Sequence, residues 1–461
     1  MKLRRALTLF DVVNLVIGTI IGADIYIVAA VGAGVLGPAS ILSWFIAGVM
    51  AIIIALVFAE SSSVLARVGG PYAYARHVFG DFIGFLVGWS LWVSSWVAIA
   101  VFPVAFVSYL LHFLSLDPIL QAVVKVVFII SLTLVNYRGV KMAGKVNDAL
   151  TVLKLAPLFI FALAGLVYFL MEPDVLMANY TPFAPYGLGG MGSVVVLVFW
   201  AYVGFELVTV PSDEVIDPKR TIPRAIIIGM VFIMFFYLLT NFVILGVVPW
   251  GLLAGSKAPL ALAGYMLLGP GGALLMALGA LFSISGSEEA GILSTARILY
   301  AMASDGLLPK VFASVHPRYR TPHVSLVFQN LTAMVAAILG TATQLINISV
   351  FTLLFCYILT CISLPLLKKG RIPIKAILGF FVCVYLMVNC SVDSILWGLL
   401  LTFIGIPLYL RYATHQPDIY VRRIAGQLQE SILVRRERRF LARFLRLMFI
   451  LIKKLKKVMA F

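Results

Sequence analysis

Residues 18–26 read GTIIGADIY and lie in the middle of a hydrophobic run that extends from Val12 to Leu36. Asp24 is the only charged residue among the 25 residues of this run, and two glycines, Gly18 and Gly22, precede it. Glycine is a poor helix former, and a charge at the centre of a bilayer costs about 3 kcal/mol on insertion scales. The stretch therefore indicates a membrane helix that is interrupted near its middle, with Asp24 in the interruption.

The composition is typical of an integral membrane protein. The 461 residues are 62% hydrophobic and 12% charged, whereas a soluble chain is about 45–50% apolar and about 25% charged. The apolar runs contain Gly and Pro without the alternation of a membrane barrel, so the sequence predicts an all-α integral membrane fold of twelve transmembrane helices. We expect these helices at residues 12–36, 40–65, 81–111, 119–135, 146–170, 190–210, 223–249, 264–303, 323–341, 344–367, 373–390 and 394–412. The eighth run is too long for one straight span, so we expect it to contain an elbow or to project from the membrane.

The distribution of Lys and Arg among the loops predicts the orientation of the helices. Alternate loops are rich in these residues, and the loops between them hold little besides Lys257 and several acids. The basic loops contain Arg67, Arg76, Arg138, Lys141, Lys145, Lys219, Arg220, Arg224, Lys310, Arg318, Arg320, Lys368, Lys369 and Arg371. Because basic loops stay on the cytoplasmic side, we expect both termini in the cytoplasm of a multi-pass protein of the cell membrane.

Residues 413–461 form a basic tail with twelve Lys or Arg and three acids. Its segment RRERRFLARFLRLMFILIKKLKK mixes basic clusters with Phe, Leu and Ile at helical spacing. Such a pattern predicts an amphipathic helix on the anionic inner surface of the membrane, and a regulatory role stays open. The net charge of +16 comes from this tail and the cytoplasmic loops, which argues against a nucleic-acid partner.

Few ionisable residues lie inside the predicted helices, and each marks a candidate site because such groups are costly there. They are Asp24, Glu60 near a helix end, Lys154, Glu206, Glu288 and Glu289. The histidines lie in loops or at helix ends, and no cysteine pair has metal-ligand spacing with a histidine. We therefore expect no catalytic site, no metal and no cofactor.

The sixth run shares a feature with the first. VVLVFWAYVGFELVTVP (195–211) places Gly204 beside Glu206 at mid-span. Gly-interrupted helices at corresponding positions in two halves are typical of transporter sites that are formed by broken helices near the midplane. The alternative is that these glycines only allow close packing between helices.

Five stretches, in order along the chain, carry a resemblance to a known family. They are GTIIGADIY (18–26), FAESSSVLARVGGPYAYARHVFG (58–80), GKVNDALTVLKLAPL (144–158), FWAYVGFELVTVPSDEVIDPKRTIPRAI (199–226) and STARILYAMASDGLLP (294–309). The first resembles the helix-one break of the amino acid–polyamine–organocation transporters, and the fourth resembles their helix six. The likeness to this family extends from about residue 7 to 412.

The resemblance implies two inverted five-helix repeats with broken helices one and six, followed by two extra helices. The corresponding parts of the chain are a cytoplasmic N-terminus (1–11), a first repeat (12–170), a second repeat (171–367), the extra helices (368–412) and the tail (413–461). Alternating access around a site near the midplane is implied as well. The resemblance also implies that Lys154 fills the place of a coupling cation, and that Trp200 corresponds to the aromatic gate of relatives that exchange basic substrates.

The expected substrate-binding residues come from the two breaks and the eighth helix. They are Ile20, Gly22, Ala23 and Asp24, then Trp200, Ala201, Tyr202 and Gly204, and finally Glu289; Lys154, Glu206 and Glu288 are expected to act in coupling or gating. Asp24 departs from the family, most members of which have glycine there. A carboxylate at this point would repel a substrate carboxylate and attract an ammonium group. Three roles for Asp24 stay open: recognition of a cargo amine, an ion pair with Lys154, and transfer of a proton.

The sequence thus predicts a secondary transporter for amino acids or related amines, not an enzyme. We expect it to be independent of sodium and either coupled to protons or exchanging, with cationic amino acids or polyamines favoured by Asp24, Glu288 and Glu289. The alternatives are a carrier of neutral amino acids in which Asp24 pairs with Lys154, a sensor or channel that does not cycle, and a membrane enzyme. The expected partners are the small substrate, a proton, and the lipid bilayer, with anionic lipid at the tail.

Overall fold

The computed structural model describes residues 6–22, 24–111, 114–256, 258–340, 342–368, 372–390 and 392–413. The chain consists of two units, 1–408 and 409–461, and of the second unit only residues 409–413, the end of a helix, are described. The predicted tail helix therefore lies outside the described residues. All regular structure in the described residues is helical, apart from one isolated β-bridge between Leu7 and Val215.

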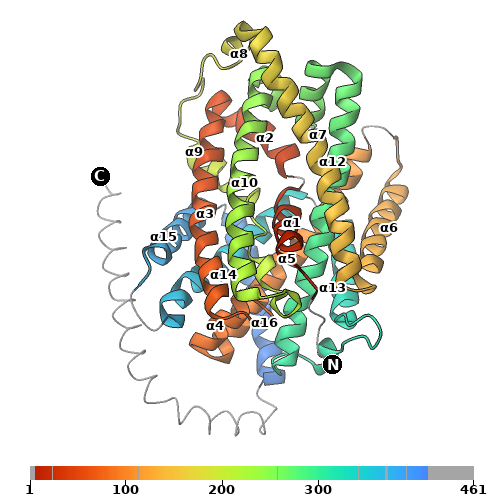
Figure 1. Cartoon of the computed structure of the whole chain (residues 1–461), viewed down its shortest axis with the longest axis vertical. Helices are drawn as coiled ribbons and strands as arrows, with labels where there is room; N and C mark the ends of the chain where they lie inside the picture. Colours follow the sequence, from red (N-terminus) through yellow and green to blue (C-terminus); the bar gives the residue numbers. More distant parts are fainter. Residues whose placement is uncertain are drawn as a thin grey trace. The chain divides into compact units, whose positions relative to one another are not determined.

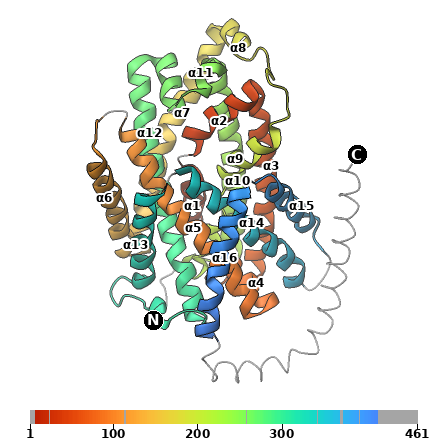
Figure 2. The same cartoon turned by 180° about the vertical axis from the view of Figure 1, so that it is seen from behind.

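The described residues form sixteen α-helices and four short 3-10 helices (Figure 1; Figure 2 shows the opposite side). The α-helices are α1 Leu9–Ile20, α2 Asp24–Leu36, α3 Ser40–Val64, α4 Pro71–Phe79, α5 Asp81–Leu110, α6 Pro118–Tyr137, α7 Val140–Met171, α8 Pro173–Asn179, α9 Met191–Trp200, α10 Pro218–Val247, α11 Trp250–Ala254, α12 Pro259–Ser304, α13 His323–Leu339, α14 Ala342–Leu367, α15 Ile374–Val388 and α16 Val392–Ala413. The 3-10 helices are η1 Gly37–Ala39, η2 Leu207–Thr209, η3 Ser212–Glu214 and η4 Lys310–Ala313.

Within the described residues, eight helical stretches are long and apolar enough to cross a membrane. They are Val28–Val64, Asp81–Leu110, Pro118–Tyr137, Val140–Met171, Pro218–Val247, Pro259–Ser304, Ile348–Leu367 and Ile395–Ala413, and four shorter apolar helices, α1, α9, α13 and α15, accompany them. The prediction of an all-helical, multi-pass membrane protein is confirmed, and the count of twelve crossings stays a prediction.

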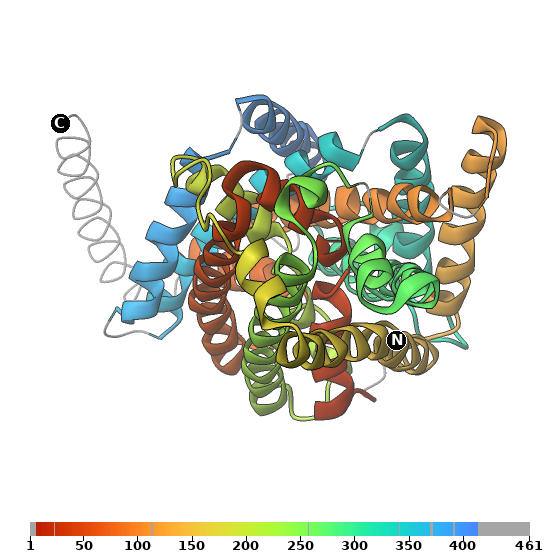
Figure 3. The same ribbon diagram turned by 90° about the horizontal axis from the view of Figure 1, so that it is seen from above.

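The long helices of the first unit pack against one another in pairs. α12 packs against α7, α10 against α3, and α14 against α5. Seen from above, α10 lies between α3 and α7 and next to α1 (Figure 3). α5 is buried over most of its length, whereas α7 exposes Val152, Leu163 and Leu170. A side of a long helix that is apolar and exposed is suited to contact lipid.

Two of the predicted spans are divided where their sequences contain glycine. The first run becomes α1 and α2, with a break after Ile20 and a new helix from Asp24. The sixth run becomes α9, which ends at Trp200 and is followed by turns and η2. The long eighth run, α12, bends at Gly269, whose φ is 69° and ψ −157°, directly before Pro270. This bend is an elbow of the kind that the length of the run predicts.

The start of the described chain is attached to the segment that follows the sixth run. The backbone N–H groups of Ala6 and Leu7 donate to the carbonyl oxygen of Glu214 in η3, at 2.8 and 3.0 Å. The carboxylate of Glu214 accepts in turn from the guanidinium of Arg297 on α12, and both side chains are buried. Glu214 therefore joins three distant parts of the sequence, through its carbonyl oxygen and its carboxylate.

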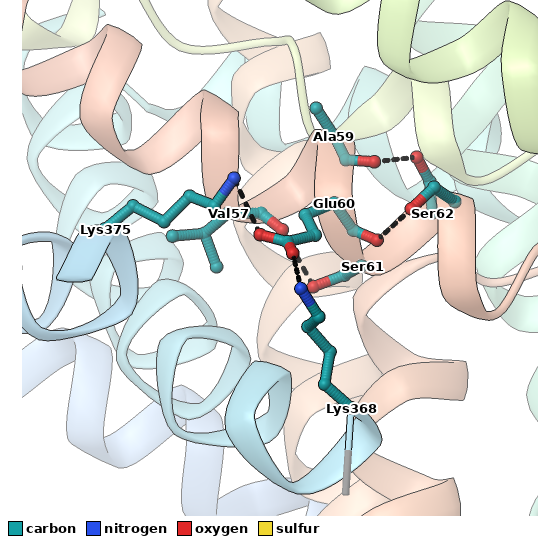
Figure 4. A network of polar contacts seen from close by, with 8 residues as sticks. Val57, Ala59, Glu60, Ser61, Ser62, Lys368 and Lys375 are labelled. Atoms are coloured by element: carbon teal, nitrogen blue, oxygen red, sulfur yellow. Dashed lines mark hydrogen bonds and ion pairs between the residues drawn. The ribbon is translucent and has the colours of Figure 1, made fainter. Parts of the chain in front are cut away.

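A second group of charges joins α3, α14 and α15. Glu60, near the end of α3, forms ion pairs with Lys368, which follows α14, and with Lys375 on α15, the latter at 2.6 Å (Figure 4). Neither lysine is fully buried. Glu60 thus acts as a structural contact between helix ends, away from the two breaks.

Candidate functional site

The end of α1 exposes backbone carbonyl groups that the helix itself does not satisfy, as helix ends generally do. Lys154, on α7, reaches this end with a side chain that is 0% exposed. Its Nζ donates to the carbonyl oxygens of Ile17, Gly18 and Ile21 at 3.2, 2.9 and 2.6 Å. An ammonium group has three donors, so these contacts use all of them. The negative end of the α1 dipole also favours a cation at this position.

Two serines of α12 complete the contacts at the end of α1. The hydroxyl of Ser287 donates to the carbonyl oxygens of Gly18 and Ile21, both at 2.9 Å. The hydroxyl of Ser283 lies 3.1 Å from Ile21 O. The break in the first run is therefore built from backbone oxygens of α1 and side chains of α7 and α12. Irregular backbone at membrane depth needs such partners.

Asp24 is the first residue of α2, on the other side of the break. Its carboxylate lies at the N-terminal end of α2. The side chain is 5% exposed, and the hydroxyl of Tyr237 lies 3.4 Å from Oδ2 and 3.1 Å from Ile20 O. Asp24 and Lys154 are both described, and no ion pair within 4.0 Å joins them.

The second break follows Trp200, where α9 ends. Gly204 has a φ of 130°, which is strained for any residue with a side chain. A Cβ there would also lie 3.0 Å from the carbonyl carbon of Thr19, so the two breaks are in contact. Glu206 holds the turn, because its Oε2 accepts from the N–H of Gly204 at 3.0 Å and from the hydroxyl of Tyr357 at 2.5 Å.

A cavity lies where the two breaks meet. Its wall contains residues from α1, α2, α5, α9, the turn before η2, η2 itself, α12 and α14. The lining residues are Thr19, Ile20, Asp24, Ser94, Ser95, Ala98, Ile99, Phe102, Trp200, Val203, Gly204, Glu206, Leu207, Ser287, Gly291 and Ser349. These lining residues, all of them described, include two carboxylates and no Lys, Arg or His.

The structure brings five of the predicted site residues to this cavity. Ile20, Asp24, Trp200, Gly204 and Glu206 line it, and Ala23 lies outside the described residues. Gly22, Lys154, Ala201, Tyr202, Glu288 and Glu289 are not among the lining residues. The hydroxyl of Tyr202 donates to Trp44 O at 3.0 Å, and Oε1 of Glu289 accepts from Asn136 Nδ2 at 3.2 Å.

The contribution of α5 to the cavity was missed from the sequence. Ser94 and Ser95 form the polar part of this wall, and the hydroxyl of Ser94 donates to Ser349 O on α14 at 2.9 Å. Ser349 reciprocates, because its hydroxyl donates to Ser94 O at 3.0 Å. The signal in the sequence was a pair of serines inside an otherwise apolar run.

The chemistry of this arrangement is that of binding. Among the described residues no group of three or more His, Cys, Asp or Glu is placed to hold a metal ion. The cavity offers carboxylate and hydroxyl oxygens beside an indole ring, which suits a small solute with hydrogen-bond donors or a positive charge.

Comparison with known proteins agrees with this geometry. A sequence model of the family described as "Amino acid permease" matches residues 7–417. The methylthioribose transporter of Bacillus subtilis is 31% identical over 405 residues, which are 81% of this chain and 84% of that protein. The branched-chain amino acid permeases BcaP of Bacillus subtilis and of Lactococcus lactis subsp. cremoris are 27% and 26% identical, over 89% of this chain in each case and 94% and 95% of their own lengths.

These relatives are transporters, and they align with the present chain over most of their length. The resemblance of the five stretches quoted above is thereby confirmed, and the hypothesis of a membrane enzyme is set aside. The chain belongs to the amino acid permease family.

Proposed function

We propose that this protein is a secondary active transporter that moves amines or cationic amino acids through the cavity between the two helix breaks. The observation that supports this cargo best is the charge of the cavity wall. Asp24 and Glu206 lie on it, and no basic residue is among its described lining residues. Carboxylates in a partly desolvated site attract a solute with a net positive charge, such as a polyamine or a cationic amino acid, more strongly than a neutral amino acid, whose ammonium and carboxylate charges cancel.

Asp24 is the better candidate of the two acids for contact with the cargo. The Oε2 atom of Glu206 is already bonded to Gly204 and Tyr357, which suits a role in holding the break and in coupling. The side-chain contact of Asp24 is weaker, because the hydroxyl of Tyr237 lies 3.4 Å from its Oδ2. Trp200, on the same cavity, supplies an aromatic face that can cover a cation.

A carrier of neutral solutes is the second candidate, and the relatives favour it. Two of them are named for branched-chain amino acids and one for methylthioribose. In a carrier of neutral solutes, an ion pair with Lys154 would balance the negative charge of Asp24. The contacts of Lys154 with three carbonyl oxygens weaken this version, since the ammonium has no donor left for Asp24.

The remaining features of the proposal concern the fold and the coupling. The proposed architecture has twelve crossings in two inverted five-helix repeats (12–170 and 171–367) and two extra helices (368–412), with both termini in the cytoplasm and the tail 413–461 on anionic lipid. The ammonium of Lys154 occupies the end of α1 where a metal cation would otherwise be favoured. We therefore propose transport that is independent of sodium and uses a proton or an exchanged solute instead.

Binding of a ligand to the folded state raises its apparent stability, so thermal unfolding tests the cargo. Purified protein is heated with putrescine, spermidine, arginine, lysine, leucine, valine or methylthioribose, and Asp24→Asn is compared with wild type. Asp174→Asn, which makes the same change on α8 outside the cavity, is the matched control.

We expect the amines to raise the unfolding temperature of wild type and of Asp174→Asn but not of Asp24→Asn. Stabilisation of wild type and Asp24→Asn alike by leucine or methylthioribose, with no effect of the amines, would replace the amine proposal by the neutral carrier. Uptake of the stabilising solute into proteoliposomes preloaded with the same solute then separates a transporter from a sensor, which binds without uptake.

A further inference from the structure

Glu288, on α12, carries a buried carboxyl group that does not line the cavity. Its side chain is 0% exposed, and neither Oε1 nor Oε2 has a hydrogen-bond partner in the described part of the chain. The adjacent Glu289 differs, since Asn136 donates to its Oε1. An ionised carboxylate without any partner is too costly to bury, so Glu288 carries its proton in this conformation.

The position of Glu288 on α12 separates it from Lys154. A Cβ added to Gly286 would lie 3.6 Å from the Nζ of Lys154, so that side of α12 faces the lysine. Two residues further along an α-helix the side chain has turned by about 200°. Glu288 therefore points away from Lys154, whose three donors are in any case used by the end of α1.

Other ionisable groups lie on the helices that pack against α12. Among the helices that pack against it, α7 carries Asp148, which accepts from Asn14, and α2 and α10 carry Asp24 and Tyr237, which contact each other. Further ionisable groups on these helices include Tyr26 of α2, Tyr109 of α5, Asp11 of α1, Lys125 of α6, His323 of α13, and Glu289 and Arg297 on α12 itself. None of these described groups forms a hydrogen bond or an ion pair with Glu288.

Glu288 is nevertheless next to the cavity along α12. Ser287, which precedes it, and Gly291, three residues further on, both line the cavity, and residues three apart lie on one side of a helix. The hydroxyl of Ser287 also bonds Gly18 O and Ile21 O at the end of α1. A displacement of α1 would therefore act directly on the turn of α12 that carries Glu288.

We propose that Glu288 is the proton-binding residue of the transport cycle. Its carboxyl group holds a proton while this turn of α12 is closed to water. The proton is released when movement of α1 gives water access to that turn. This inference rests on the proposed transporter function, and it assigns the proton to Glu288 instead of Lys154 or Asp24.

The test uses full-length protein in proteoliposomes, with the membrane potential clamped by valinomycin and equal potassium on both sides. Radiolabelled arginine, putrescine and leucine serve as probes. Three quantities are measured: counterflow, which needs no net movement of protons, accumulation driven by a pH gradient, and acidification of an entrapped pH dye. The variants are Glu288→Gln, which mimics the protonated side chain, Glu289→Gln, and Glu172→Gln in the exposed segment after α7 as a matched control.

We expect Glu288→Gln to retain counterflow and to lose both gradient-driven accumulation and dye acidification, down to the level of protein-free liposomes. Glu289→Gln and Glu172→Gln are expected to keep the response to the gradient. Should Glu288→Gln accumulate the probe and acidify the dye like wild type, or wild type show counterflow without any proton movement, the inference is wrong while the transporter function stands. Absence of counterflow in wild type for every probe would instead contradict the proposed function.

A second variant covers the case in which Glu288→Gln does not fold. Glu288→Asp keeps a carboxyl group but shortens the side chain, so we expect gradient-driven uptake with a shifted pH profile. An unchanged pH profile in this variant counts against the inference, because a residue that binds the proton must influence it.

Discussion

The Nζ of Lys154 on α7 lies 2.6 Å from the carbonyl oxygen of Ile21, directly after the end of α1. The same nitrogen donates to Ile17 O and Gly18 O. This lysine therefore closes the first break in the way that a bound cation would, through backbone oxygens and without a carboxylate partner.

Lys154→Met should destabilise the protein and abolish transport. Its removal takes a charged donor from three buried carbonyl groups at the end of α1 and leaves Gly18 O and Ile21 O to the serine hydroxyls of α12. A hydrogen bond to a charged group contributes about 1.5–3 kcal/mol. The measurement is thermal unfolding in detergent, together with counterflow in proteoliposomes. Lys145→Met, an exposed position on the same helix, is the control and should unfold like wild type. Equal unfolding temperatures for both variants would contradict a closing role for Lys154.

Gly204→Ala should impair folding and transport far more than a comparable change elsewhere. The backbone there has a φ of 130°, and the new Cβ would meet the backbone of Thr19 at 3.0 Å. A non-glycine residue in such a conformation costs of order 1–3 kcal/mol before the collision is counted. Gly251→Ala on α11, where a Cβ meets nothing within 4 Å, is the matched control. The yield of monodisperse protein and counterflow are the readouts, and a fully active Gly204→Ala would exclude a close contact between the two breaks.

Breaking the buried pair between Glu214 and Arg297 should be strongly destabilising. Removal of one partner leaves an uncompensated buried charge, which costs about 3–5 kcal/mol. A double-mutant cycle with Glu214→Gln and Arg297→Met, followed by thermal unfolding, should show that the second change adds less than it does alone. Arg220→Met, at the exposed pair with Asp217, is the control and should change stability by less than about 1 kcal/mol. Purely additive effects of the two changes at the buried pair would mean that the residues act independently.

Glu60→Gln should have a small effect that depends on salt. Its partners Lys368 and Lys375 are 41% and 33% exposed, so solvent screens the attraction, and such pairs contribute about 0–1 kcal/mol. We expect the difference in unfolding temperature between wild type and Glu60→Gln to shrink as sodium chloride is raised, since salt screens exposed charges. A large difference that persists in high salt would show that Glu60 acts through burial instead of charge.

The sequence predicted the helical architecture well because the apolar runs are long and bounded by Gly, Pro and charges. The predicted span 40–65 corresponds to α3, Ser40–Val64, and both glycine-containing breaks coincide with interruptions in the structure. Asp24 was expected at the site from its charge inside an apolar run, and Trp200 from the resemblance to the transporter family; both lie on the cavity.

The wall from α5 could not be predicted in the same way. Serines in membrane helices commonly bond a carbonyl one turn earlier, so a serine in an apolar run carries little information. Ser94 is different only because Ser349, 255 residues away in sequence, lies opposite it. Glu289, in contrast, was expected at the site but lies beside Asn136 instead. Its direction depends on how α12 is rotated about its own axis, which the sequence of one helix does not determine.

The reciprocal bonds between Ser94 and Ser349 have a mechanical consequence. Each hydroxyl is attached to the other helix's backbone, and the two hydroxyl oxygens are 3.1 Å apart. Sliding α5 along α14 by a single residue would break all three contacts at once inside a buried interface. The two helices are thus held in register at the level of the cavity. A movement that reshapes this side of the cavity must therefore displace α5 and α14 together, as one rigid unit.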